Sequence, residues 1–277
     1  MPTKRDADTT REFLVKKYDG WLDHPWGKEY FENSDFANFG YWGEDTQTQK
    51  QACENLMDKL LMTIPDKSGT ILDVACGKGA TTRHLLKHWA PESVTGINIS
   101  DNQLEAARKN APGATFVNMS ATDMKFENES FNNIICVEAA FHFITRKKFL
   151  QEAFRVLKPG GRIVMTDILS PRWVERFTPM LTPDNHIQDP DEYEEFLNGL
   201  GYREAQLVDT TDPCWNRWNQ QLIEFLQGKV KKGEMKPRQF RTFLLERFFR
   251  AATVRFYVMV AARKPLEVAE AGSGGAR

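Results

Sequence analysis

Apolar residues in the middle of this chain follow two alternating patterns. Short apolar runs predict strands, and stretches with apolar residues three or four positions apart predict helices. Strands are expected near residues 70–76, 93–99, 115–119, 131–137 and 162–166. Helical spacing is present in residues 47–62, 81–89, 101–109 and 146–157. Strands that alternate with helices of this length build a mostly parallel sheet with helices on both faces, so we expect an α/β fold.

Two further helical regions flank or interrupt this core. The apolar positions of residues 9–32 predict a helix, and residues 213–250 are mostly helical between strands expected at 202–210 and 253–262. We therefore expect an N-terminal helical lid with a linker, an α/β core, a helical insertion that caps the substrate, a last core strand and a disordered tail. The boundaries that we predict for these five parts are 1–64, 65–212, 213–250, 251–264 and 265–277.

The composition is that of a globular protein and narrows the choice of partners. A net charge of −1 over 277 residues gives no reason to expect nucleic acid or an acidic membrane surface. No apolar run approaches the ~20 residues of a membrane helix, and the polar start MPTKRDADTT lacks the apolar core of a secretory signal. The four cysteines lie far apart in the sequence, which is typical of a reducing compartment and not of a metal site. We expect a cytoplasmic protein without a membrane span or a metal, and the sequence leaves the oligomeric state open.

The stretch Thr70–Ala80, TILDVACGKGA, has the pattern strand, glycine turn, helix. Gly77 and Gly79 allow a sharp turn and a close approach of the backbone to a ligand. The spacing is not the full G-x-G-x-x-G pattern, because Thr82 stands at its last position, and the Lys-Ser/Thr ending of a phosphate loop is missing too. The loop alone is thus compatible with a nucleotide-like ligand or with a turn that needs glycine for its geometry.

Further stretches, in order, are VTGINIS, SATDMKFENESFNNI, EAAFHF and RVLKPGGRIVMTD. Together with LDVACGKG they resemble the class I S-adenosylmethionine-dependent methyltransferases over residues 70–167. The similarity is greatest to antibiotic-sugar O-methyltransferases and tocopherol-type C-methyltransferases, in which a loop like Phe39–Trp42 often precedes the core. The resemblance implies a Rossmann-like sheet, S-adenosylmethionine as the cofactor and a small-molecule acceptor.

The resemblance also assigns cofactor contacts to matching positions. Asp73 would receive the methionine ammonium group, and Gly77 and Gly79 would lie against the methionine and ribose portions. Asn98 stands where the family usually has an acid that binds both ribose hydroxyls, and Gln103 is expected to share that task.

Adenine contacts are expected at Met119-Ser120-Ala121, where the family usually has Gly-Asp-Ala. Ser120 would accept a hydrogen bond from the adenine amino group, and the Ala121 amide would meet a ring nitrogen. Tyr18 and Glu138 are further expected contacts by position. The alternative for Asn98 and Ser120 is that they only fill loops.

His142 and Asp167 are the expected catalytic pair. Both follow strands whose ends face the cofactor edge, and related O-methyltransferases use a histidine and an aspartate at these positions. A histidine is suited to take a proton from an attacking hydroxyl, and an aspartate can orient it. The alternative is that His142 caps a helix or lines the pocket. His84 and His88 are expected on a solvated helix face.

Tryptophans outside the core are candidates for the acceptor pocket. Aromatic walls favour an apolar or aromatic acceptor, although lid packing explains tryptophans equally well. The residues expected to line the pocket are Trp21, Trp26, Trp42, Trp215 and Trp218. A basic run at residues 229–241 either binds an anionic group of the acceptor or is a solvated helix end, and we favour the second.

These observations favour a methyltransferase for a small, largely apolar or aromatic specialised metabolite, with oxygen as the preferred methylated atom. Carbon or nitrogen methylation on the same fold, for example of a prenyl diphosphate or a phenol ring, is the alternative. A NAD-dependent oxidoreductase is disfavoured by the incomplete glycine pattern and by Asn98. A non-enzymatic SAM-binding or nucleic-acid module is disfavoured by the balanced charge.

Overall fold

The computed structural model describes residues 24–176 and 185–266. A seven-stranded sheet with the order β3-β2-β1-β4-β5-β7-β6 forms its centre. The first five strands pair in parallel, and β7 runs antiparallel to both β5 and β6. The strands are β1 Ile71–Val74, β2 Val94–Asn98, β3 Thr115–Asn118, β4 Phe131–Cys136, β5 Leu157–Leu169, β6 Arg203–Asp209 and β7 Phe256–Arg263.

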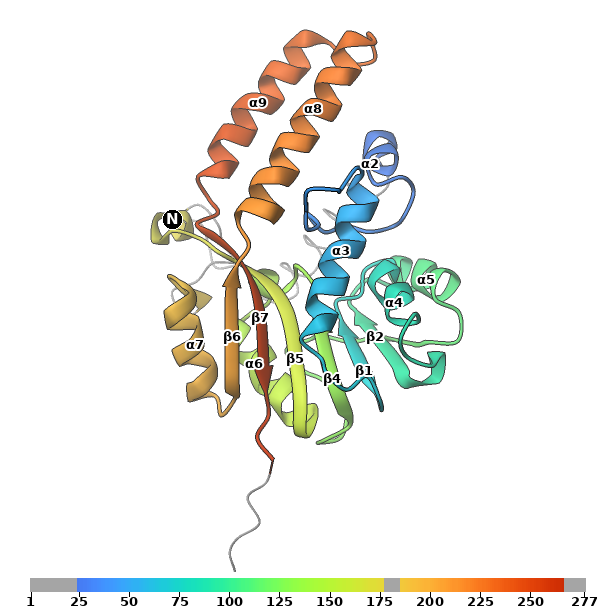
Figure 1. The fold of residues 1–277 in the computed structure, drawn as a ribbon, viewed down its shortest axis with the longest axis vertical. Coiled ribbons are helices and arrows are strands. Elements are labelled where there is room, and N and C mark those ends of the chain that lie inside the picture. Colours follow the sequence, from blue (N-terminus) through green and yellow to red (C-terminus); the bar gives the residue numbers. More distant parts are fainter. Residues whose placement is uncertain (1–23, 177–184, 267–277) are drawn as a thin grey trace, which may run out of the picture.

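Helices cover both faces of the sheet, as the alternating pattern predicts (Figure 1). Alternate strand residues point to opposite faces, so Ile71 and Ile135 pack with α3, whereas their neighbours Leu72 and Ile134 pack with α6 and α7. The longer helices of the described residues are α3 Gln49–Met62, α5 Asp101–Asn110, α6 Arg146–Val156, α7 Pro190–Gly199, α8 Arg217–Lys231 and α9 Pro237–Ala251, and the shorter ones are α2 Pro25–Tyr30 and α4 Ala80–Leu85.

Local sequence determines where several of these helices begin. The side chains of Thr48, Ser100, Thr145 and Asp189 each accept a hydrogen bond from a backbone N–H in the first turn of α3, α5, α6 and α7. Such caps satisfy amide groups that have no partner within the helix. The starts of these four helices are therefore encoded in the local sequence.

The strand order reverses between β1 and β4. The chain runs outward from β1 to β2 and β3, and then returns to place β4 on the other side of β1. In sheets of this kind the connections diverge at this point and leave a crevice beyond the carboxyl ends of the strands. This topology positions the loop after β1 and the loop after β4 beside one opening.

Residues 158–161, with the sequence KPGG that is typical of a turn, lie within β5. Gly160 donates a backbone hydrogen bond to Lys264, and Lys264 donates one to Gly161, so the segment pairs with the chain that follows β7. Gly160 has φ +80°, which a non-glycine residue adopts at a cost. The glycines thus bend the strand and do not end it.

The helical insertion before the last strand is formed by α8 and α9, which stand as a pair beyond one end of the sheet (Figure 1). A π-helical turn, Asp212–Asn216, leads from β6 into α8. Of the helix expected at residues 9–32, only the part from residue 24 lies within the described residues, where it contains α2. No described helix is both long and apolar enough to cross a membrane. The domain boundaries given above stay predictions.

Candidate active site

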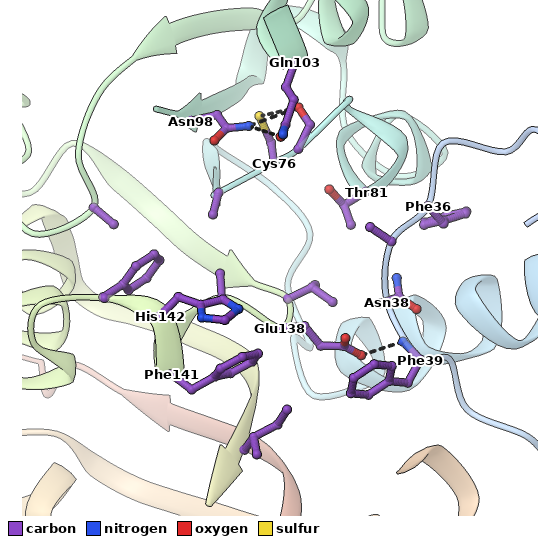
Figure 2. Close-up of a pocket in the computed structure, with 18 of the residues that line it drawn as sticks. Phe36, Asn38, Phe39, Cys76, Thr81, Asn98, Gln103, Glu138, Phe141 and His142 are labelled. Atoms are coloured by element: carbon purple, nitrogen blue, oxygen red, sulfur yellow. Dashed lines mark hydrogen bonds between the residues drawn. The ribbon is translucent and has the colours of Figure 1, made fainter. Parts of the chain in front are cut away.

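A cavity of about 1170 Å³ lies at the carboxyl ends of β1, β2 and β4. Its walls come from the loops after these strands and after β3, from the segment around Phe39, and from α8 and α9. Figure 2 shows Asn98 and Gln103 on one side and Glu138, Phe141 and His142 on another. One cavity therefore joins the glycine loop to the helical insertion.

The two glycines of the loop have different tasks. A Cβ on Gly79 would lie 2.8 Å from Cα of Ala107, so glycine is required there for α4 to pack against α5. A Cβ on Gly77 would meet only Oε1 of Gln103, at 3.9 Å, and Gly77 lines the cavity. Gly77 thus lines the cavity, and Gly79 is needed for close packing; the cofactor contacts expected of both glycines stay predictions.

Asp73 lies behind the loop and is 1% exposed. Its Oδ2 accepts hydrogen bonds from Thr81 (2.7 Å) and Thr82 (2.6 Å), and no group in the described part of the chain donates to Oδ1. Burial raises the pKa of Asp73 to about 6, although the two hydroxyl groups act in the opposite direction. Asp73 thus holds the start of α4 against β1. Its Oδ1 is the atom left to accept from the methionine ammonium group, and this contact stays a prediction.

Asn98 and Gln103 form a pair at the end of β2. The Asn98 amide donates to Oε1 of Gln103 over 2.8 Å, and the Asn98 side-chain oxygen accepts from the Ile99 N–H over 2.7 Å. Both side chains are more than 90% buried and line the cavity. The structure thus brings together the two residues expected to share the ribose contact, as a neutral amide pair in place of an acid.

Ser120 and Ala121 follow β3 and also line the cavity. The Ser120 hydroxyl lies 3.0 Å from that of Thr122, and Ala121 is buried. Their position is compatible with the predicted adenine contact. Tyr18, the other cofactor contact predicted from the N-terminal region, lies outside the described residues.

Glu138 is placed at the centre of the cavity by a strained backbone. It has φ +52°, and its N–H donates to the Thr166 hydroxyl over 2.9 Å. Its Oε1 accepts from the Phe39 N–H and from the Tyr257 hydroxyl, each over 2.7 Å. Burial raises the pKa of Glu138 to about 8, and both hydrogen bonds lower it. Glu138 therefore combines two properties of an acid–base residue: a cavity position and a pKa near neutrality.

His142 lies one turn further, in the short helix Ala140–His142. Its ring packs against that of Phe141, with the centroids 4.1 Å apart, and it lines the same cavity as Glu138. The predicted position of His142 at the cofactor edge is compatible with this arrangement. Its role as a base stays a prediction.

Asp167 has another partner than His142. Its carboxylate accepts from Nε (2.6 Å) and Nη2 (3.3 Å) of Arg146, from the Tyr193 hydroxyl (2.9 Å) and from the Ile168 N–H (2.8 Å). Asp167 is fully buried, and Arg146 is 2% exposed. Four donors occupy the lone pairs that a carboxylate offers, so Asp167 is not available to orient an imidazole. We correct the expected His–Asp pair accordingly: Asp167 is one half of a buried ion pair that joins β5 to α6.

The tryptophans divide into two groups. Trp215 and Trp218 line the cavity, where their rings stack with centroids 5.7 Å apart. Trp42 is buried in the core and donates through Nε1 to the Phe39 carbonyl, and Trp26 packs against the same core. Trp26 and Trp42 are therefore corrected to packing residues, while Trp21 lies outside the described residues.

Two further residues belong to the site: Tyr257, whose hydroxyl donates to Glu138, and Arg247, which lines the cavity. Tyr257 is near the start of β7, and an antiparallel strand begins at the edge where its parallel neighbours end, so its position could have been anticipated. Arg247 is one of several basic residues in α9, and it lines the cavity. Nothing in the sequence distinguishes it from its exposed neighbours.

A cluster of metal-ligand type lies apart from the cavity. His84 is 3% exposed, so the prediction that it lies on a solvated helix face is wrong. Its Nε2 lies 2.7 Å from Oδ1 of Asp58. One ligand atom each of Asp58, His84 and His88 lies within 4.8 Å of the others. This arrangement links α3 to α4 and is far in sequence from the catalytic candidates.

Comparison with known proteins identifies the family. Residues 71–161 match the family model described as a methyltransferase domain. The O-methyltransferase cnsE of Penicillium expansum is 30% identical over 215 residues, which are 67% of this chain and 74% of that protein. The chain belongs to the S-adenosylmethionine-dependent methyltransferases. It is of the class I, small-molecule type.

Other relatives extend the similarity of this methyltransferase to nearly its full length. The 27-O-demethylrifamycin SV methyltransferase of Amycolatopsis mediterranei is 28% identical over 91% of this chain and 97% of its own. Among solved structures, the [4+2]-cyclase SpnF has a TM-score of 0.70 at 19% identity, covering 93% of this chain and 97% of that one. Geranyl diphosphate C-methyltransferase from Streptomyces coelicolor, solved with S-adenosylhomocysteine, has a TM-score of 0.67 at 14% identity, covering 95% of this chain and 100% of that one. At such identities the structural likeness shows the fold alone, and one of these folds belongs to a cyclase.

The cofactor of this methyltransferase is S-adenosylmethionine, and the residues at the cavity fit it. The missing Cβ of Gly77 leaves an open strip of backbone beside the amides of Asn98 and Gln103. These groups suit the neutral and hydroxyl-bearing parts of the cofactor, whereas a carboxyl at Glu138 suits its cationic end. The individual contacts stay predictions.

Proposed function

We propose that the protein transfers a methyl group to a hydroxyl oxygen of a small, largely apolar or aromatic acceptor. The observation that carries this proposal is the single cavity shared by the glycine loop, Glu138, His142 and the stacked Trp215–Trp218 pair. The aromatic walls suit a flat or apolar acceptor, and the acid–base residues suit a hydroxyl that loses its proton. Two relatives named for O-methylation support the choice of oxygen.

The reaction requires alignment and the removal of one proton. S-adenosylmethionine supplies an activated methyl group on a sulfonium sulfur. The protein has to hold the acceptor oxygen in line with this carbon and exclude water, which the cavity and its helical cap support. With the cofactor bound, its methyl group would pass to the acceptor oxygen and S-adenosylhomocysteine would leave, while the imidazole of His142 or the carboxylate of Glu138 would take the hydroxyl proton. Asp167 takes no part in this step, since Arg146 holds it.

The proposal is tested by a labelled-methyl transfer screen across phenols and hydroxylated metabolites. We expect transfer to a hydroxyl oxygen, read by NMR of the product. Calorimetry with S-adenosylmethionine and NAD is run beside it, and binding of NAD without the sulfonium compound would contradict the proposal.

The base is identified by comparing pH profiles from pH 6 to 9 for His142→Ala, Glu138→Gln and the exposed control His88→Ala. The variant that lacks the base loses a large part of its rate and the rise of rate with pH, and the control keeps both. If both cavity variants match the wild type, neither residue takes the proton.

Carbon methylation is the second candidate. Trp215 and Trp218 line the cavity, and aromatic rings stabilise a positive charge that develops on a carbon framework. A product with a new carbon–carbon bond in the same NMR experiment would favour it over oxygen methylation.

A further inference from the structure

Helix α9 brings a guanidinium group to the part of the cavity wall that the helical insertion forms. Arg247 is 8% exposed and lines the cavity together with Phe243, Glu246 and Arg250. Its Nε and Nη2 are buried, and no group in residues 24–176 or 185–266 accepts a hydrogen bond from either. A buried arginine normally has an anionic or carbonyl partner, because its charge is costly to remove from water.

Two aromatic rings hold this side chain in place. The guanidinium carbon lies 4.6 Å from the ring centroid of Trp218 and 5.2 Å from that of Trp215. Such contacts use the face of the planar group and leave its N–H edge for an oxygen acceptor. Arg247 is therefore positioned but not satisfied.

Other buried donors accompany it. The Nε1–H of Trp218 and the hydroxyl of Tyr30 are also buried, and neither has a partner among the described groups. Burial lowers the pKa of Arg247 to about 10, and the charge of Arg250 acts in the same direction while Tyr30 opposes it. At neutral pH the group is still charged, so this part of the cavity combines a cation with the unpaired indole N–H of Trp218. The carboxylate of Glu246 is exposed and forms no ion pair with either arginine among the described contacts.

The basic run at residues 229–241 differs in this respect. Lys229, its one buried cation, is 2.6 Å from Glu29 and 2.5 Å from Glu234. Arg238 is exposed on α9. The run is thus neutralised or solvated, and the unsatisfied cation lies one to two turns further along the same helix.

We propose that Arg247, with Arg250 beside it, binds an oxyanion group of the methyl acceptor, a carboxylate or a phosphate, at the cap end of the cavity. This inference rests on the proposed function, since it places the acceptor between the cap and the cofactor. Carboxylates and phosphates both offer the pair of oxygens that matches the edge of a guanidinium group. The stacked tryptophans, which hold this guanidinium group, line the same cavity.

The test measures binding without methyl transfer. The protein is saturated with S-adenosylhomocysteine, and calorimetry follows benzoate, phenyl phosphate and the neutral benzamide as probes. We expect benzoate or phenyl phosphate to bind at least tenfold more tightly than benzamide, and the stronger of the two identifies the anion. Equal binding of benzamide by the wild type overturns the inference, whatever the variants do.

Three variants assign the effect to the residue. Arg247→Met removes the preference for the anionic probes, Arg250→Gln weakens it, and Arg238→Gln on the exposed face of α9 leaves it unchanged. Because the charge is buried without a partner, Arg247→Met is also expected to raise the melting temperature of the ligand-free protein. A lowered melting temperature with an unchanged preference for benzoate over benzamide would show a purely structural arginine.

The outcome is separable from that of the proposed function. Binding of the anionic probes without any methyl transfer in the screen would leave the anion site in place and contradict the proposed reaction. Methyl transfer to neutral acceptors, with no preference for anionic probes, would support the proposed reaction and contradict the anion site.

Discussion

The two ends of the cavity differ in how their polar groups are satisfied. At the cofactor end, Asp73 accepts from two hydroxyl groups, and Asn98 is paired with Gln103. At the cap end, the guanidinium of Arg247 and the indole N–H of Trp218 are buried without partners among the described residues. Most polar groups named at the first region have partners within the protein, with Oδ1 of Asp73 as an exception, whereas the second region has a buried cation and donors without partners among the described residues.

This difference agrees with the extent of the family match. The methyltransferase model covers residues 71–161, which hold the glycine loop, the amide pair and the candidate base, and it ends before α8 and α9. The cofactor end serves a reactant that is common to the family. The cap end is the proposed place of the acceptor, and its chemistry has to be inferred from this chain's own residues.

The largest effect is expected from Gly79→Val at the cofactor end. The new side chain would meet the backbone of Ala107 at 2.8 Å, and φ of +81° is unfavourable for a branched residue. Strain and overpacking together cost roughly 5 kcal/mol of folding free energy, and cofactor binding is lost with the loop. Urea unfolding measures the loss of folding free energy, and calorimetry measures the loss of cofactor binding.

Gly228→Ala at the cap end is the matched control. Nothing lies within 4 Å of a Cβ at this position in α8, so the replacement gains about 0.5–1 kcal/mol through helix propensity. A loss of stability for Gly79→Val no larger than the effect of this control would refute the packing role of Gly79.

Asp167→Asn is expected to have the next largest effect, on stability. It leaves the charge of Arg146 buried without its counter-ion, and breaking a buried pair in this way costs about 3–5 kcal/mol. Thermal unfolding measures the loss, with Glu204→Gln, a surface partner of Arg162 and Arg263, as the control that changes little. If the variant is as stable as the wild type but inactive, Asp167 has a catalytic role and not a structural role.

Trp218→Ala tests the cap directly. It removes the ring beneath Arg247 and part of the cavity wall, so we expect the acceptor KM to rise about tenfold, or about 1.4 kcal/mol. The dissociation constant of the cofactor should stay the same, because Trp218 belongs to the other end. Trp42→Phe, within the core, should leave the KM unchanged. Equal changes in KM and cofactor affinity would mean that the two ends are not separate.

Glu138 provides a pH-dependent test at the border between the ends. Its carboxyl titrates near 4.5 in the unfolded chain and at about 8 in the folded protein. Between these values the folded state holds a proton that the unfolded state has released, so this group makes the free energy of unfolding fall as pH rises. We expect Glu138→Gln to reduce that fall, by at most about 1.4 kcal/mol per pH unit. Unfolding by urea at pH 5, 6.5 and 8, without cofactor, measures it.

Asp73 also titrates in this window, with a pKa of about 6, but it does so in both proteins and cancels in the comparison. Identical pH dependence in the wild type and in Glu138→Gln would show that Glu138 is not protonated in the folded state at pH 6.5.

Much of the fold and the cofactor end was predictable from the sequence. The alternation of short apolar runs and helical spacing predicts the strands and helices of the core, because each element buries one of its faces and so repeats with its own period. The glycine turn, Asn98, Gln103 and Ser120 follow successive strands, and parallel strands bring their carboxyl ends to one edge. The family motifs then identify the cofactor.

The tertiary structure decided which partner each polar side chain has. Asp167 and His142 end at the same edge of the sheet, yet Asp167 pairs with Arg146, four residues beyond His142 in the chain. Glu138 meets Tyr257 across 119 positions, and Lys229 meets Glu29 across 200. Arg247 stays unpaired although the same helix carries other basic residues. Local periodicity determines which face of an element is buried, but only the packing of distant segments determines which charges are neutralised and which remain for a ligand.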